Sequence, residues 1–234
     1  MSTSGLLSPI TINTLVVRNR AVMPSMLTNF ATKGGDVTER LIHYYAERAK
    51  GGVGMNIVEA TYVARSGNSF DLGLGISDDF MIKGLSKLTD AVHRHDGKIA
   101  IQLQHGGRFG NPPTSGCPRL LVSMIPGLAP TENARVMDAD DIEGMVEAYV
   151  QAARRAVEAG FDAVEIHGAH GYLLEQAASV FTNHRTDGYG GSLAKRLRFP
   201  TQLVHAVRAA VDEDFPHPLP RYLHGGRTGT ASTR

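Results

Sequence analysis

Two histidines and a tyrosine lie within six residues in the segment HGAHGY, at positions 167–172. This segment directly follows the short apolar run 161–166, which is typical of a buried strand. A strand that ends in this way places two imidazoles and a titratable phenol at its carboxyl end. In an α/β barrel, the carboxyl ends of the strands form the face at which chemistry takes place.

Three interpretations of this segment are open from the residues alone. In the first, His167 and His170 bond to nearby backbone and only line a loop. In the second, they bind zinc together with Glu59 or Glu165. Strand alternation is expected to point Glu165 away from the neighbourhood of His167, and no third ligand stands at a suitable spacing, so no metal site is predicted. In the third, the imidazoles donate to an anionic oxygen of a substrate while Tyr172, whose ordinary pKa is about 10, supplies a proton.

Candidate site residues, most of them polar, follow the other apolar runs as well. Those expected near strand ends are Pro24, Ser25 and Met26, then Glu59, Ala60 and Thr61, then Gln102, Gln104, His105 and Arg108. Because Gln102 alternates with Ile101 and Leu103, its side chain is expected to point into the barrel near the upper layer. Its amide is either a satisfied buried group or the partner of a heterocycle such as a flavin pyrimidine. Arg108 either pairs with a surface acid or accepts a substrate anion.

The elements that position these groups alternate between short apolar runs and helical patterns. Strands are predicted over 19–23, 53–58, 99–103 and 161–166. Helices are predicted over 38–50, 79–95, 142–157 and 197–211. Asp138, Asp140 or Asp141 is expected to cap the third helix, which ends at Gly160.

Alternating units with short buried strands imply a parallel sheet, either open and doubly wound or closed into a (β/α)8 barrel. An open sheet usually carries G-x-G-x-x-G in its first strand-to-helix turn, whereas this turn is PSMLTN, at 24–29. We therefore predict an α/β fold of the (β/α)8 TIM-barrel type. Such a barrel typically needs about 250 residues. Only four strand-helix units precede Phe215, so the barrel is expected to be truncated to about its first four units.

Residues 1–216 are expected to form this N-terminal part of a barrel, and residues 217–234 an aberrant, disordered tail. Pro216, Pro218 and Pro220 remove alternate backbone donors where a fifth strand is due, and the remaining tail has little apolar surface to bury. A frameshift or premature end in a GC-rich gene is the hypothesis for this change. The downstream DNA, translated in the other frames, tests it.

The composition is that of an ordinary globular protein, with 42% hydrophobic and 20% charged residues in 234. The 24 basic and 23 acidic residues are interspersed, so neither a nucleic-acid partner nor a membrane surface is expected. Small molecules are the favoured partners. The one cysteine, Cys117, excludes an internal disulfide framework and fits a reducing compartment. Since the N-terminus also lacks the features of an export signal, a cytoplasmic location is expected.

Five segments together resemble the old yellow enzyme family of FMN-dependent oxidoreductases. They are NRAVMPSM (19–26), VEAT (58–61), IQLQHGGR (101–108), AGFDAVEIHGAHGYLLEQ (159–176) and TNHRTDGYGGSLAKRLRF (182–199). The resemblance covers about residues 6–216. Met26 after Pro-Ser is more similar to the branch that contains 2,4-dienoyl-CoA reductase and related NADH:flavin oxidoreductases.

The resemblance implies which residues contact the cofactor. Pro24, Ser25 and Met26 would lie along the flavin of FMN. Ala60 and Gln102 would contact its ring system, with Gln102 bonding to the pyrimidine edge.

The resemblance also implies the roles of the HGAHGY residues. His167 and His170 would bind the carbonyl oxygen of an α,β-unsaturated substrate and stabilise the enolate charge that develops there. Hydride would pass from reduced FMN to the β-carbon, and Tyr172 would protonate the α-carbon from the opposite face. Arg185, Asp187 and the segment 189–191 would belong to a structural turn.

The implied function is that of an FMN-dependent NAD(P)H oxidoreductase of ene-reductase type, acting on activated C=C bonds of α,β-unsaturated carbonyl or enoyl compounds. Two departures from the family lead us to expect impaired activity. Arg221 is displaced by one residue from the family's flavin-contacting arginine, and the strand-seven and strand-eight loops that bind the FMN phosphate are missing. The cysteine cluster and second flavin domain of the dienoyl-CoA reductase branch are missing too. The alternative is a non-catalytic half-barrel fragment without stable flavin binding.

Overall fold

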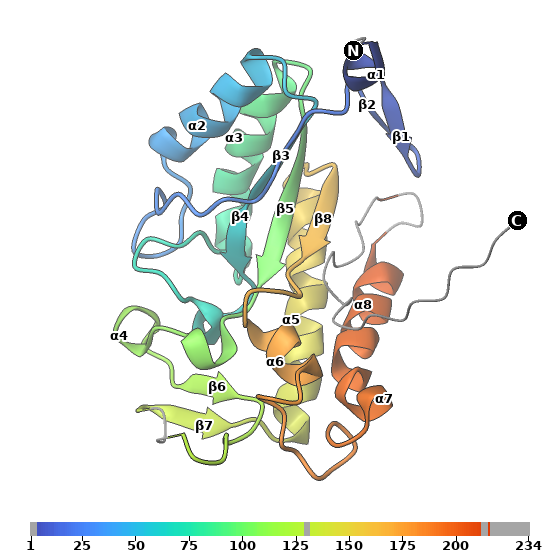
Figure 1. Ribbon diagram of the computed structural model, residues 1–234. Helices are drawn as coiled ribbons and strands as arrows, with labels where there is room; N and C mark the ends of the chain where they lie inside the picture. Colours follow the sequence, from blue (N-terminus) through green and yellow to red (C-terminus); the bar gives the residue numbers. More distant parts are fainter. Residues whose placement is uncertain (1–3, 129–131, 212–214, 216–234) are drawn as a thin grey trace, which may run out of the picture.

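The computed structural model of the protein describes residues 4–128, 132–211 and 215. Its centre is a parallel sheet with the strand order β3-β4-β5-β8. The four strands are β3 (Val22–Met23), β4 (Met55–Tyr62), β5 (Lys98–Gln104) and β8 (Ala163–Ile166). The predicted α/β architecture with a parallel sheet is therefore present (Figure 1).

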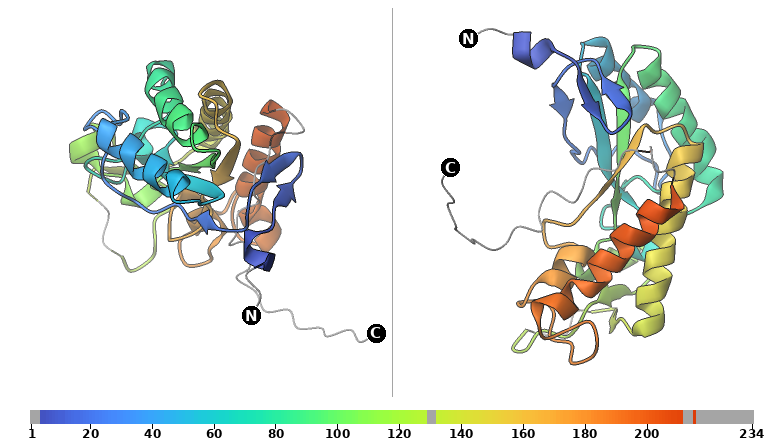
Figure 2. Two further views of the ribbon diagram at one scale, coloured as in Figure 1. Left: turned by 90° about the horizontal axis from the view of Figure 1, so that it is seen from above. Right: turned by 90° about the vertical axis from the view of Figure 1, so that its right-hand side faces the viewer.

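Four long helices cover one face of this sheet. They are α2 (Glu39–Lys50), α3 (Ile82–His93), α5 (Ala139–Glu158) and α8 (Arg198–Ala210). In the view from above they lie in an arc around the strands (Figure 2). The main hydrophobic core lies between the strands and these helices, where Leu41, Leu85 and Tyr149 are fully buried against strand residues such as Ile101 and Leu103. This burial is the principal stabilising term of the fold.

The helices begin where local capping groups allow. The Thr38 side chain accepts the N–H of Leu41 at the start of α2. At α5, Asp138 and Asp141 form a reciprocal capping box, so the structure selects Asp138 as the cap among the three candidate aspartates. The predicted helix over 79–95 divides into a short 3-10 turn, η2 (Asp79–Met81), and α3.

The first, second and fourth strands begin later than predicted, the second at Met55 rather than 53. The first strand is only Val22–Met23 rather than 19–23. The Asn19 side chain accepts the N–H of Ala21 and donates to the carbonyl of Gly52, so the residues before β3 form a turn. The fourth strand begins at Ala163 rather than 161.

The second and third strands are longer than predicted. Strand β4 continues to Tyr62, four residues beyond the predicted end at Val58, and β5 includes Gln104. The residues VEAT and Gln104 therefore lie within strands and not after them. Polar residues inside these strands misled the apolar-run criterion, because this end of the sheet is polar on its inner face.

Several short elements interrupt the simple alternation and were not predicted. They are α1 (Ser4–Leu7), β1 (Ile10–Ile12), β2 (Leu15–Val17), η1 (Arg65–Gly67), η3 (Gly107–Phe109), α4 (Pro112–Ser115), β6 (Arg119–Leu121), β7 (Ala134–Val136), α6 (Leu173–Ala178) and α7 (Leu193–Arg196). Strands β6 and β7 pair with each other, in parallel, near the carboxyl ends of the main strands (Figure 1). These elements are too short to give a periodic signal.

The antiparallel pair β1–β2 closes the amino end of the sheet. Val17 of β2 packs against the start of three main strands through Met55, Ile57, Ala100 and Ala163. Figure 1 shows the pair beside the amino ends of the strands, opposite the loops that carry the polar motifs. One end of the partial barrel is thus apolar and sealed, and the other is available for chemistry.

Some predictions fall beyond the described residues. The tail 217–234 and Arg221 lie outside them, so the expected tail and the division at residue 216 stay predictions. In the part of the chain that the structure describes, no helix combines the length and apolar character needed to cross a membrane.

Candidate active site

A row of inward-facing residues crosses three strands near their carboxyl ends. Ala60 of β4 pairs with Gln102 of β5, and Gln102 pairs with Glu165 of β8. Between Val58 and Ala60 the register shifts, because Glu59 is an extra residue that forms a β-bulge. The bulge places the small Ala60 side chain beside Gln102, where an unbroken strand would place the Glu59 carboxylate.

The Gln102 amide is held in one orientation by two acceptors. Its Nε2 donates to the Ser25 hydroxyl oxygen at 2.7 Å and to Glu165 Oε2 at 3.1 Å, and Ser25 Oγ lies 3.2 Å from the same carboxylate oxygen as a donor. A carboxylate can only accept, so Glu165 fixes which end of the amide faces it. No described residue donates to Gln102 Oε1, which leaves this oxygen as an acceptor for a ligand N–H.

The expected orientation of Glu165 is wrong. Residues two apart on a strand share a face, so Glu165 lies on the same inner face as His167 rather than away from it. Its bonds to Gln102 and Ser25 hold it there. Gln102 does point inward as predicted, with 7% of its surface exposed.

The segment after β3 alternates in exposure. Ser25 is partly buried and forms, with Gln102 and Glu165, a set that we call the polar row. Pro24 and Met26, on either side of Ser25, are exposed. Met26 is 58% exposed. An open apolar side chain next to a fixed polar row is suited to contact the face of a flat ligand.

Glu59, displaced by the bulge, is buried elsewhere. Its Oε2 accepts the backbone N–H of Thr28 at 2.7 Å, and Oε1 has no partner among the described residues. Burial raises the pKa of Glu59, and the hydrogen bonds from Thr28 oppose part of that rise. Glu59 therefore anchors the loop after β3 and does not join His167 in a ligand set.

His167, His170 and Tyr172 form one group of contacting rings, the ring cluster, beyond the polar row. The ring centroids of His167 and His170 are 5.1 Å apart, and those of His167 and Tyr172 are 5.0 Å apart. Since His167 follows Glu165 by two residues, the cluster begins roughly 7 Å further along the strand from the polar row. Polar row and ring cluster thus share one face of the sheet.

The local backbone explains how three rings meet. The His167 N–H extends the strand by donating to the carbonyl of Leu103. His170 then adopts φ +59° and Gly171 φ +74°, both in the left-handed region. This turn is unusual for a histidine, and it brings the chain back so that His170 and Tyr172 both contact His167.

The electrostatic environment sets the protonation states of the cluster. Burial, with a smaller contribution from the neighbouring His170, lowers the pKa of His167 to about 4, so this imidazole is neutral at pH 7 and keeps one N–H to donate. Burial raises the pKa of Tyr172, so its phenol stays protonated at neutral pH. The cluster therefore combines a neutral donor with a retained phenolic proton.

His105 has a structural place instead. It is fully buried, its Nδ1 accepts the N–H of Gly107 at 3.0 Å, and its Nε2 lies 3.0 Å from the Ser66 hydroxyl. Burial lowers the pKa of His105 to about 3. A neutral ring whose Nδ1 accepts must carry its proton on Nε2, so His105 donates to Ser66.

Arg108 and Phe109 lie at the edge of the site. The Arg108 guanidinium has no hydrogen-bond or ion-pair partner among the described residues, so the surface ion pair, one of the two alternatives for this residue, is not formed there. With Arg119 it borders an open cavity of about 510 Å³. Phe109, also on that cavity, packs edge-to-face on Tyr172 with centroids 6.2 Å apart. Cys117 is a partly buried free thiol in a nearby loop.

The zinc interpretation finds no geometric support within the described residues, where no three His, Cys, Asp or Glu side chains gather in a way that could hold a metal ion. His167 and His170 contact each other, but Glu165 is engaged by Gln102 and Glu59 by Thr28. Among the described residues, neither carboxylate is grouped with the two histidines in such a set.

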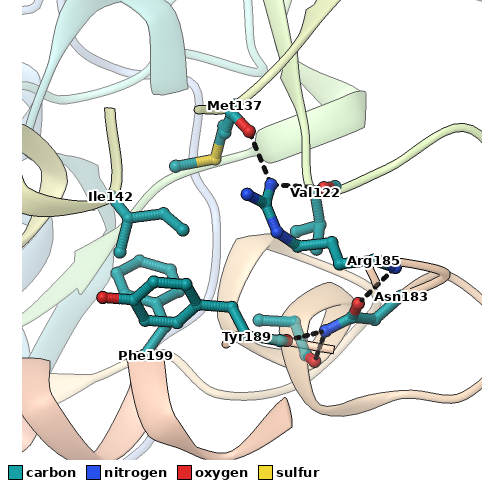
Figure 3. A pocket seen from close by; sticks show the side chains of 8 residues that line it. Val122, Met137, Ile142, Asn183, Arg185, Tyr189 and Phe199 are labelled. Atoms are coloured by element: carbon teal, nitrogen blue, oxygen red, sulfur yellow. Dashed lines mark hydrogen bonds between the residues drawn. The ribbon is translucent and has the colours of Figure 1, made fainter. Parts of the chain in front are cut away.

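Within the segment 182–199, residues 183–191 form a closed turn that precedes α7 and α8. Arg185 donates to the carbonyls of Val122 and Met137, and the Asn183 amide donates to the carbonyl of Tyr189 (Figure 3). Arg185 also pairs with Asp187. The cavity there holds only about 10 Å³, room for about one water. These bonds give Arg185 and Asp187 the structural role that was predicted for them.

Two residues that sequence reasoning did not single out connect the loops of the site. Gln176 of α6 bonds to backbone groups of two different loops, and Glu175 Oε2 accepts the N–H of Gly171. A buried glutamine directly after a strand-end motif is the signal that could have revealed this. Two of its three partners, Gly106 and Arg108, lie about 70 residues away in the chain, so their identity could not be read locally.

The fold and these groups define a partial parallel α/β barrel with a polar site at the carboxyl ends of its strands. Residues 5–220 match the model of the NADH:flavin oxidoreductase / NADH oxidase family, and the chain belongs to this family. It is 40% identical over 223 residues to an NADH oxidase of Thermoanaerobacter brockii. Among solved structures it is similar to a 2-naphthoyl-CoA reductase in complex with 2-naphthoyl-CoA (TM-score 0.87, 30% identity). It is also similar to an old yellow enzyme from Pichia sp. AKU4542 (TM-score 0.85, 32% identity).

These similarities cover most of this chain but only part of each relative. They span 93% of the chain and 34% of the NADH oxidase, 92% and 35% for the naphthoyl-CoA reductase, and 90% and 58% for the old yellow enzyme. The resemblance to the old yellow enzyme family and the partial TIM barrel are confirmed. So are, for the family, the oxidoreductase class and FMN with NAD(P)H as reductant.

Proposed function

We propose that this chain provides the flavin-facing and substrate-facing side of an FMN-dependent NAD(P)H oxidoreductase that reduces activated C=C bonds of α,β-unsaturated carbonyl or enoyl compounds. The observation that supports it best is the shared inner face of the polar row (Ser25, Gln102, Glu165) and the ring cluster. The first offers fixed hydrogen-bonding groups to a heterocycle, and the second a neutral donor beside a protonated phenol.

The polar row fits the edge of a flavin. Glu165 holds the Gln102 amide so that Oε1 is available to accept a ring N–H. Ala60, beside Gln102, projects only a methyl group, and the exposed Met26 and Pro24 offer apolar surface for a ring face. When bound, FMN supplies the hydride for the reaction. Pro24, Ser25, Met26, Ala60 and Gln102 would hold its ring system.

The ring cluster fits a carbonyl group and the carbon next to it. Neutral His167 and its neighbour His170 would donate to the carbonyl oxygen, where negative charge develops as the C=C bond is reduced. Tyr172 retains its proton at neutral pH and would give it to the α-carbon. Arg108, which has no partner in the described part of the chain, would attract an anionic part of the substrate or of the nicotinamide nucleotide to the adjoining cavity, which Arg119 and Glu132 also line.

Weak flavin retention by this chain is part of the proposal. The four described main strands pair as one open row with β3 and β8 at its edges, so the groups named above approach a flavin from one side of the site. We expect little FMN to co-purify. Titration with FMN, followed by its fluorescence, should give saturable binding that Gln102→Ala weakens.

Activity is tested by adding NADH or NADPH and a simple cyclic enone to the FMN-loaded chain and measuring the loss of the enone chromophore. Enone reduction that depends on FMN supports the proposal. A chain that takes up no FMN at any concentration contradicts it, and favours the alternative of a non-catalytic half-barrel fragment. Among the described strands β8 has a neighbour on one side only, and this is the observation behind that alternative, since unpaired strand edges promote association.

A further inference from the structure

The loop that carries His170 and Tyr172 is fastened to a second loop by one side chain. Gln176, in the second half of α6, is 2% exposed and lies between the turn after β8 and the turn after β5. A glutamine amide has two N–H donors and a carbonyl acceptor. In Gln176 all three are used for backbone groups of these two turns.

The bonds are specific in direction. Gln176 Nε2 donates to the carbonyl of Gly171 at 2.5 Å and to the carbonyl of Gly106 at 3.2 Å. Its Oε1 accepts the N–H of Arg108 at 3.1 Å. Gly171 belongs to the HGAHGY segment, whereas Gly106 and Arg108 follow β5. One amide therefore joins two loops whose bonded residues, Gly106 and Gly171, are 65 positions apart in the chain.

The fit around this amide leaves little freedom. Gly107 adopts φ +58°, and a Cβ atom built on it would come within 2.5 Å of Gln176 Oε1. The N–H of Leu173 donates to the carbonyl of His105 at 3.0 Å and adds a second tie between the same loops. The β5 loop in turn presents Phe109, whose ring packs on Tyr172.

The neighbouring Glu175 holds the other side of the same turn. Its Oε2 accepts the N–H of Gly171 at 2.7 Å. The N–H and the carbonyl of Gly171 are thus bound by consecutive residues of α6. This stabilises the left-handed turn through His170 and Gly171, which is costly for a histidine without such support.

We propose that Gln176 is a positioning residue: by joining the β5 and β8 loops it sets the place of Tyr172 and His170 relative to His167. The inference rests on the function proposed above for these three residues, which touch the substrate, whereas Gln176 acts only through the backbone that carries them. An error of about 1 Å in the position of a reacting group can cost about 100-fold in rate.

A pair of exchanges tests the direction of the bonds. Gln176→Glu keeps an acceptor for Arg108 N–H but removes the donors to Gly171 and Gly106. Glu175→Gln keeps an acceptor for the N–H of Gly171, so the same amide–carboxylate exchange should be tolerated there. Gln176→Met, of similar length and without hydrogen bonds, is the second variant if Gln176→Glu does not fold. Gln202→Glu, at an exposed position of α8, controls for a new charge.

The first readout needs no flavin. Nuclear Overhauser contacts between the rings of His167 and Tyr172, and of Phe109 and Tyr172, should be lost or weakened several-fold in the Gln176 variants and kept in Glu175→Gln and Gln202→Glu. The methyl signals of Leu41 and Leu85 in the distant core should not move. Unchanged ring contacts in a folded Gln176 variant would overturn the proposal, whether or not the chain binds FMN.

The second readout separates positioning from general damage in the FMN-loaded chain. Enone reduction, started from flavin that light has already reduced, should slow by about 100-fold in Gln176→Glu, while FMN affinity stays within about twofold, since Gln176 bonds to neither Gln102 nor Ser25. A loss of FMN affinity as large as the loss of rate would mean that Gln176 only supports the fold, and would also overturn the proposal. Absence of any enone reduction in the parent chain counts against the proposed function and leaves the ring contacts to decide on Gln176.

Discussion

Two neighbouring rows on the inner face of the sheet have opposite characters. Ile57, Ala100 and Ala163 pair across three strands near the amino ends, in contact with the β1–β2 pair. The next row toward the carboxyl ends is Ala60, Gln102 and Glu165. Strands β5 and β8 advance by two residues between the rows, and β4 by three because of its bulge.

The difference shows how one sheet separates stability from chemistry. The apolar row is buried by the hairpin and contributes hydrophobic free energy. The polar row is held by directed hydrogen bonds whose geometry leaves one acceptor, Gln102 Oε1, for a ligand. Because each apolar side chain needs only to be covered, and each polar one needs specific partners, the two rows should respond differently to substitution.

The largest effect is expected in the proposed active site, at the carboxyl ends of the main strands. Tyr172→Phe removes the proposed proton donor but keeps the ring contacts with His167 and Phe109. Enone reduction by the FMN-loaded chain should fall by about 100- to 10,000-fold, with flavin reduction by NADH and the thermal midpoint nearly unchanged. Stopped-flow measurement of the two half-reactions checks this. Near-normal enone reduction would remove Tyr172 from the mechanism.

The apolar row should show the reverse pattern. Ile57→Ala leaves a cavity among Met55, Ala100 and Val17 and should lower the free energy of unfolding by about 3 kcal/mol. Urea unfolding followed by circular dichroism measures it. Ile10→Ala in β1, where the side chain is only partly buried, is the matched control and should cost less. An equal or smaller loss for Ile57→Ala would argue against a sealed amino end.

Acid should destabilise the protein through two buried histidines at the carboxyl ends of the main strands. Burial lowers the folded-state pKa values of His105 to about 3 and of His167 to about 4. The unfolded chain, with histidine pKa values near 6.5, therefore binds more protons below that pH. Stability should be full above pH 6.5 and fall by up to about 1.4 kcal/mol per pH unit for each histidine as the pH drops toward its folded-state pKa.

Unfolding curves between pH 7 and 4 check this dependence. His105→Gln should reduce the slope by the share of one histidine, whereas Ile57→Ala should lower the whole curve without changing its slope. A slope that stays the same in His105→Gln would show that the acid sensitivity arises elsewhere.

The smallest effect is expected from the orientation of one amide. In Glu165→Gln, residue 165 can present either end to Gln102, so the orientation of Gln102 is no longer fixed. FMN affinity should weaken by roughly tenfold, about 1.4 kcal/mol, as measured by fluorescence titration. Glu143→Gln on the exposed face of α5 should leave the affinity unchanged. If both variants bind FMN equally well, Glu165 does not orient the site.

Much of the outer layer of the fold was predictable. Leu41, Tyr45 and Ala49, at helical spacing, predicted the buried face of α2, and Leu85, Leu88 and Val92 that of α3. Local capping chemistry limited the start of α5 to three aspartates. Residues on one face of a helix recur at a regular spacing within a short stretch, so the spacing of the apolar residues identifies the buried face.

The inner layer was predictable only in part. Alternation with Ile101 and Leu103 placed Gln102 inward, and the HGAHGY motif indicated where the chemistry would lie. The same alternation misjudged Glu165, and it gave no sign that a bulge would exchange Glu59 for Ala60. A single extra residue reverses the faces of everything after it, and the decision depends on the neighbouring strand.

The sequence by itself determined the alternating α/β pattern, the buried helix faces and the residues of the candidate site. These follow from local periodicity and from residue chemistry, both of which are present in short segments. Only the tertiary structure decided that Glu165 orients Gln102, that β1–β2 seals the amino end, and that Gln176 joins two loops. Such bonds connect positions far apart in the chain, and their partners are selected by the folded geometry rather than by neighbours in the sequence.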